Sequence, residues 1–134
     1  MPILKWTDSL SVGVREIDAQ HKTLIMNLNE LFDAMKQGKA NTMLKFLLSK
    51  LVAYTQMHFS TEEKYMKQWN YKEYAAHKAE HDAFVKKVAD FKGEYDQGKT
   101  LLSVEVLTFL KDWVANHIQV TDKKYSSLFN EHGL

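Results

Sequence analysis

Five histidines and two carboxylates recur along the chain at spacings that suit a metal site inside a helical protein. His58 and Glu62 are four residues apart, as are His77 and His81, so each pair lies about one turn apart on one helix face. Many imidazoles with few acids suit transition metals, whereas magnesium and calcium prefer oxygen ligands. The candidate ligands are His21, His58, Glu62, His77, His81, His117 and Asp122.

The number of candidate ligands indicates two metal ions. A single zinc takes about four ligands, so the set is too large for one zinc site. If both carboxylates and a solvent-derived oxygen bridge two irons, about eleven of twelve octahedral positions are filled. One position then stays open for a small molecule. A lone buried histidine is usually a satisfied core residue, but an ordinary hydrogen-bond network would not satisfy five of them together with two acids.

The elements that must position these side chains are helices. Apolar residues recur at alternating steps of four and three along four stretches, and the candidate histidines fall at core positions of that pattern. The only proline is Pro2, so nothing in the body of the chain interrupts a long helix. The pattern predicts helices at about 18–37, 42–66, 72–95 and 101–118.

The connections between these stretches are short and polar, which makes successive helices antiparallel neighbours. We therefore predict an all-α fold, an up-down-up-down four-helix bundle, formed by a single domain spanning residues 1–134. The first seventeen residues lack helical periodicity and are expected to pack as an ordered N-terminal arm. A short C-terminal helix, capped by Thr121 or Asp122, is expected to follow the last long one.

Several local signals refine this prediction. Gly38 is expected to stop the first helix, and Asn41 or Thr42 to cap the second. Asp18 either caps the first helix or orients a ligand. His117 and Asp122 are five residues apart, too many for one regular helix face, so the last helix should end or bend between them.

Composition narrows the possible partners. The chain has 134 residues and a net charge of +1, without a basic run that would attract nucleic acid. It has no cysteine, which excludes disulfides, thiolate ligands and iron–sulfur clusters. No stretch is long and apolar enough for a signal peptide or a membrane span. We therefore expect a cytoplasmic protein with no nucleic-acid partner and no membrane insertion.

The sixth histidine and the methionines are not expected to be metal ligands. His132 lies near the C-terminus beside a glycine and should be an exposed non-ligand. The methionines of the helices are expected to fill gaps in the helical core; they are Met26, Met35, Met43, Met57 and Met66.

Four motifs together resemble the hemerythrin family over essentially the whole chain. Each is common by chance, but all of them in this order at helix-length separations are specific. They are Ile17-Asp18-Ala19-Gln20-His21, His58-Phe59-Ser60-Thr61-Glu62, His77-Lys78-Ala79-Glu80-His81 and His117-Ile118-Gln119-Val120-Thr121-Asp122. Myohemerythrin is a known example of the up-down-up-down bundle. The resemblance is to single-domain, bacterial-type members.

The resemblance implies a role for each candidate ligand. One iron would be held by His77, His81 and His117, and the other by His21 and His58. Bridges between the irons would come from Glu62, Asp122 and an oxo or hydroxo group. The second iron would be the open one, at which dioxygen binds reversibly. Val114 would line the dioxygen pocket, at a position where the family commonly has leucine. Trp113, the residue before it, either lines the same pocket or fills the core.

The expected function is therefore reversible dioxygen binding by a non-haem di-iron protein that is not an enzyme. It would store, buffer or deliver dioxygen, with an oxygen-consuming enzyme as recipient. The alternative is a di-iron oxidase, peroxidase or nitric-oxide-handling enzyme, although di-iron oxygenases use ligand sets richer in carboxylates. A third possibility, iron storage, would need many more ions per chain or a cage-like assembly.

Overall fold

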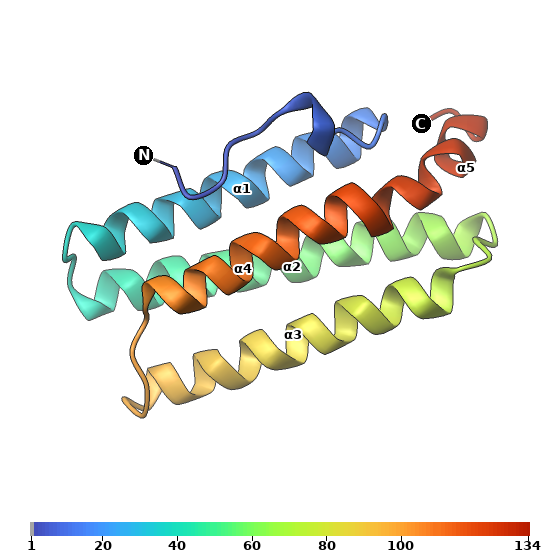
Figure 1. Ribbon diagram of the computed structural model, residues 1–134. Coiled ribbons are helices and arrows are strands. Elements are labelled where there is room, and N and C mark those ends of the chain that lie inside the picture. The colour runs from blue at the N-terminus through green and yellow to red at the C-terminus, as the bar shows by residue number, and fades with distance from the viewer. Residues whose placement is uncertain (1) are drawn as a thin grey trace.

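The computed structural model describes residues 2–134, and the regular structure of this part of the chain is helical. Four helices form the bundle in Figure 1: α1 (Arg15–Lys36), α2 (Asn41–Gln68), α3 (Tyr74–Asp96) and α4 (Val104–Asn116). The chain then passes through a π-turn, η2 (His117–Thr121), and a 3-10 turn, η3 (Asp122–Tyr125), into α5 (Ser126–Glu131). The predicted four-helix bundle and short C-terminal helix are confirmed.

The two ends of the bundle differ in their covering. The α1–α2 turn and the α3–α4 loop lie at one end, whereas the α2–α3 turn and α5 lie at the other (Figure 1). The N-terminal arm, residues 2–14, runs beside α1 toward α5 and includes the 3-10 turn η1 (Asp8–Leu10). Arm residues Leu10, Val12 and Val14 are buried. The arm therefore adds apolar cover at the end where α5 lies, as expected of an ordered segment.

The interior of the bundle is divided along its length. The half nearer the α1–α2 turn is packed with aliphatic side chains, each fully buried leucine contributing roughly 1.5–3 kcal/mol. Leu31, Leu48 and Leu107 are among those that have no exposed surface. The candidate metal ligands occupy the other half, nearer α5. Within residues 2–134, no helix combines the length and apolar character that crossing a bilayer requires.

Asp18 does neither of the things predicted for it. α1 begins at Arg15, so Asp18 lies inside the helix rather than at its cap. Its carboxylate accepts hydrogen bonds from Ser11 Oγ at 2.5 Å and from the Val12 N–H at 2.8 Å, and not from His21. The prediction was wrong because the arm folds back over the start of α1 and supplies donors from outside the helix.

The ends of the other helices can be compared with the predicted caps and stops. Gly38 ends α1 at a φ of 69°, as predicted. α2 begins at Asn41 without a side-chain cap, so the predicted cap at Asn41 or Thr42 was wrong. α4 begins later than predicted because Ser103 accepts a hydrogen bond from the Val106 N–H and thereby fixes the start at Val104.

The methionine prediction was correct only in part. Met66 is buried and Met35 partly buried. Met26, Met43 and Met57 are 59%, 47% and 44% exposed. These three lie on outer faces because branched aliphatic, aromatic and imidazole side chains already occupy the inner positions of their helices.

Replacing Asp18 with alanine should loosen the arm. The change removes the acceptor for two hydrogen bonds, and we expect the free energy of unfolding to fall by about 1–3 kcal/mol. Urea denaturation would measure this loss, and limited proteolysis would report cleavage of residues 2–14. Asp8→Ala is the matched control, because Asp8 is an exposed arm residue. Equal losses in the two variants would contradict the anchoring role.

Candidate metal centre

A π-turn explains the five-residue spacing between His117 and Asp122. The Asp122 N–H donates to the carbonyl of His117, an i→i+5 bond that widens the helix by one residue. This turn places Nε2 of His117 3.0 Å from Oδ1 of Asp122. The predicted bend is therefore a π-turn. Neither Thr121 nor Asp122 caps α5, since the residue before α5 is Tyr125 and it makes no side-chain cap.

The structure brings all seven candidate ligands together inside the bundle, each no more than 2% exposed. They form two groups that share both carboxylates, and within each group the potential ligand atoms lie within 4.8 Å of one another. The first group is Glu62, His77, His81, His117 and Asp122, and the second is His21, His58, Glu62 and Asp122. The first group thus contains the three histidines expected at one iron and the second the two expected at the other. Glu62 and Asp122 belong to both groups.

Asp122 faces both groups. Its Oδ1 lies 3.0 Å from Nε2 of His77 and 3.0 Å from Nε2 of His117. Its Oδ2 lies 3.1 Å from Nε2 of His21, in the other group. One carboxylate therefore presents an oxygen to each group, as a bridging ligand must.

Glu62 lies between the groups from the side of α2. Its Oε1 is 3.3 Å from Nε2 of His58 and 3.5 Å from Nε2 of His81. Its Oε2 accepts a hydrogen bond from the hydroxyl of Tyr125, which is fully buried. Tyr125 was not among the sequence predictions, and its position three residues after Asp122 is the signal that could have indicated it. It orients Glu62 from the C-terminal side of the cluster.

Hydrogen bonds within the described part of the chain leave the centre of this cluster unsatisfied. Seven buried atoms lack a partner: both ring nitrogens of His21 and of His77, both oxygens of Asp122, and Oε1 of Glu62. Each unsatisfied polar atom costs roughly 1–3 kcal/mol. Imidazole nitrogens and carboxylate oxygens converging in this way fit iron and similar transition metals, which would satisfy the inward-facing atoms together.

The electrostatics also favour cations. Burial lowers the pKa of His81 to about 2 and, with neighbouring histidines, holds the pKa of His58 well below its usual value. Burial and the charge of Asp122 raise the pKa of Glu62. Burial opposes ionisation of Asp122 as well, but the charge of His117 and the close approach of the His21 and His77 rings hold the pKa of Asp122 well below its usual range. The lowered pKa values of His58 and His81 keep these two imidazoles neutral beside two crowded acids, an arrangement that positive ions stabilise.

Three side chains outside the cluster support ligands through the outer ring nitrogen. The bonds run from His58 Nδ1 to Gln20 Oε1 at 2.7 Å, from His81 Nδ1 to Glu63 Oε2 at 2.8 Å and from His117 Nδ1 to Glu80 Oε1 at 3.0 Å. Donation at Nδ1 leaves Nε2 free to bind metal. Sequence reasoning gave these three residues no role. The sequence did offer a signal, because each of the three directly precedes or follows a candidate ligand. From that position its side chain reaches a candidate ligand on the next helix along the chain.

The predicted pocket residues border the cluster. Trp113 and Val114 line a cavity of about 10 Å³ together with His21 and His58. The Trp113 ring also stacks on His117, with 4.4 Å between ring centroids. His117 and Asp122 line the same cavity, so the structure places both predicted residues at the edge of the cluster, with Trp113 against the three-histidine group.

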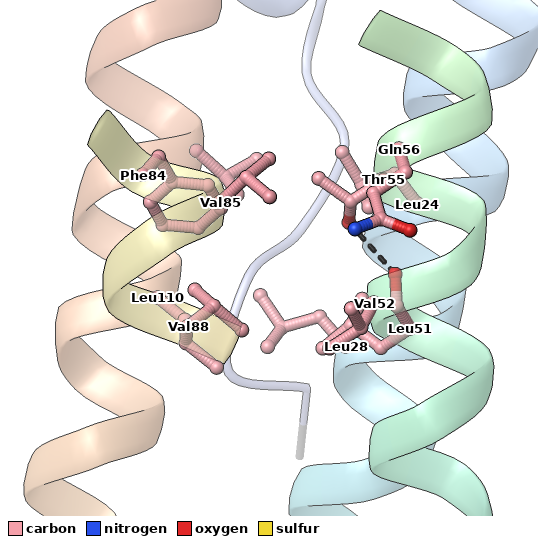
Figure 2. A pocket seen from close by; sticks show the side chains of 11 residues that line it. Leu24, Leu28, Leu51, Val52, Thr55, Gln56, Phe84, Val85, Val88 and Leu110 are labelled. Carbon is pink, nitrogen blue, oxygen red and sulfur yellow. Dashed lines mark hydrogen bonds between the residues drawn. The ribbon is translucent and has the colours of Figure 1, made fainter. Parts of the chain in front are cut away.

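A second cavity, of about 20 Å³, adjoins the first and shares Leu24, Thr55 and Val114 with it. Figure 2 shows α2 side chains such as Val52 facing Val85 across this space. The Thr55 hydroxyl donates to the Leu51 carbonyl at 2.7 Å, the dashed line in Figure 2, so it is already satisfied. The remaining lining is mostly aliphatic, and a small cavity of this kind stays dry.

Comparisons with known proteins agree with this geometry. Residues 12–129 match the model of the Hemerythrin HHE cation binding domain. The chain is 36% identical to bacteriohemerythrin of Methylococcus capsulatus, over 93% of this chain and 95% of the relative. It is 34% identical to that of Stenotrophomonas maltophilia, over 98% and 85%. A crystal structure of wild-type hemerythrin superposes with a TM-score of 0.90 at 34% identity, covering 93% of this chain and 96% of the other.

His77→Ala tests whether His77 is a metal ligand. Because His77 Nε2 faces Asp122 at the centre of the cluster, its loss should lower metal affinity by about tenfold or more. His132→Ala is the control, since His132 is exposed and stacks on Trp69. Iron per chain, measured by elemental analysis after gel filtration, reports the difference. Equal iron content in the two variants would show that the ligand assignment is wrong.

Proposed function

Because the chain belongs to the hemerythrin family of HHE cation-binding proteins, we propose that it binds dioxygen reversibly at a pair of irons. His77, His81 and His117 would hold one iron, and His21 and His58 would hold the other. Glu62 and Asp122, which both groups share, would be ligands common to the two irons. A bound iron pair supplies the two electrons that reversible dioxygen binding requires. The observation that carries the proposal is the buried cluster whose two groups share both carboxylates.

The chain's own contribution is to hold imidazoles in place and to keep water out. Gln20 orients His58 from one side, and Val114 and Leu24 separate the two-histidine position from the larger cavity. Apolar lining limits the supply of protons to bound dioxygen, and thus its loss as peroxide. Dioxygen is itself small and apolar, so the same lining admits it.

The ligand set supports a carrier rather than an enzyme. Di-iron enzymes that activate oxygen use carboxylate-rich sets, whereas five of the seven candidate ligands here are histidines. Neutral imidazoles lend less charge to high-valent iron than carboxylates do. We therefore propose storage, buffering or delivery of dioxygen, with an oxygen-consuming enzyme of the cytoplasm as recipient.

Anaerobic reduction followed by exposure to air tests this function. The iron-loaded protein should give a coloured adduct that disappears under vacuum and returns with air, through repeated cycles. Visible absorption follows the cycles, and elemental analysis should give two irons per chain. Rapid oxidation without a reversible phase, or steady consumption of dioxygen when a reductant is present, would support the enzymatic alternative instead.

Val114 should set how long the adduct survives. Leucine at this position adds a methylene group beside a cavity of about 10 Å³, which narrows the path for water. We expect the oxygenated form of Val114→Leu to decay roughly twofold to tenfold more slowly than the native protein. Val104→Leu, at a 56% exposed site on the same helix, should decay at the native rate. Equal or faster decay in Val114→Leu would count against the proposed role.

A further inference from the structure

We propose that the two metal positions of the proposed di-iron centre are unequal. The position of His77, His81 and His117 fills first and holds its metal tightly, whereas that of His21 and His58 is exchangeable. Glu63 and Glu80 are the positioning residues that create much of the difference. The inference rests on the proposed two-metal site and adds an order of loading to it.

The outer hydrogen bonds differ in charge between the two positions. In the three-histidine position, two of the three rings, His81 and His117, each donate to a carboxylate, Glu63 at 2.8 Å and Glu80 at 3.0 Å. Nδ1 of the third, His77, has no hydrogen-bond partner among the described residues. A carboxylate partner makes the imidazole a stronger donor to metal, and a hydrogen bond to an ionised group is about twice as strong as a neutral one.

The two-histidine position lacks such support. His58 donates to Gln20, whose amide oxygen is neutral. Nδ1 of His21 has no hydrogen-bond partner within residues 2–134. Neither imidazole is therefore strengthened by a charged partner, and one is not oriented by an outer hydrogen bond.

Ring stacking shows the same asymmetry independently. His81 lies flat on Phe59, with centroids 3.7 Å apart and planes 2° apart, and His117 lies on Trp113 at 4.4 Å and 11°. His21 and His58 meet edge to face at 4.5 Å and 71°, and His58 lies tilted against Phe59 at 6.0 Å and 46°, so neither of them is stacked flat on an aromatic ring. A ring fixed between a stacked aromatic and a hydrogen bond loses little freedom on binding metal, so the three-histidine position is better preorganised.

The shared carboxylates make filling sequential. A metal in the three-histidine position draws in Glu62 and Asp122, which are also the acids of the other group. The second metal then binds to acids that are already ordered. Because the exchangeable position is the one proposed to bind dioxygen, loss of one metal removes function while the remaining metal still joins the helices.

Chelator extraction tests the order directly. Protein loaded anaerobically with Fe²⁺ is mixed with excess ferrozine, and the absorbance of the iron chelate follows release. Two phases of equal amplitude are expected, because each chain gives up one iron readily and one slowly. His58→Ala should retain one iron and show only the slow phase. A single phase that releases both irons would overturn the inference.

Substitutions of the residues that bond the outer ring nitrogens test whether these hydrogen bonds cause the difference in release rate. Glu63→Gln and Glu80→Gln should each accelerate the slow phase by about 10- to 100-fold and leave the fast phase unchanged. Glu63→Gln should have the larger effect, because the Glu63 side chain is 19% exposed and that of Glu80 48%, so water screens Glu80 more. Gln20→Glu should slow the fast phase, since it gives His58 a charged partner.

Glu16→Gln is the matched control, because Glu16 accepts from the Tyr65 hydroxyl away from the cluster and should leave both phases unchanged. Equal acceleration of both phases in the Glu63 and Glu80 variants would indicate general loosening and overturn the positioning role. Far-UV circular dichroism checks that each variant is helical. If Glu63→Gln or Glu80→Gln fails to fold, the Gln20→Glu variant serves as the test instead. An unchanged fast phase in Gln20→Glu would then overturn the inference. Failure to hold two irons at all would instead refute the proposed function.

Discussion

A polar, acid-containing cluster is buried in the middle of the helical bundle, and much of the surrounding structure follows from it. An apolar core would stabilise the same four helices without further help. Here one half of the interior is occupied by imidazoles and carboxylates, and several of their inward-facing atoms lack partners within residues 2–134. Cations that share its lone pairs would stabilise such a cluster, so we expect folding and metal binding to be coupled.

Much of the remaining architecture serves that cluster. The π-turn after α4 rotates Asp122 inward beneath His117 at the point where α-helical geometry would have turned it away. Tyr125, one turn further on, holds Glu62, while the N-terminal arm and α5 cover this end of the bundle. The polar half is thereby shielded from water even though its centre is charged.

Support for the ligands passes from helix to helix. A residue beside a ligand on α1, α2 or α3 bonds the ligand of the next helix in the chain, through Gln20, Glu63 and Glu80. Among the residues that the structure describes, none makes the corresponding bond to His21 on α1. The bundle therefore surrounds its centre unevenly, and this unevenness distinguishes the position proposed to bind dioxygen from the one that anchors the metal pair.

The sequence by itself determined the helices, their order and the seven inward-facing polar residues, because helical periodicity decides which side chains share a face. It could not determine what lies beside that face on another helix. The anchoring of the arm by Asp18, the outer partners and the exposed methionines were missed for this reason, since each depends on a neighbouring element. The form of the bend between His117 and Asp122 also required the tertiary structure. A spacing of five excludes a regular helix, but the packing against α1 and α3 decides that a π-turn resolves it.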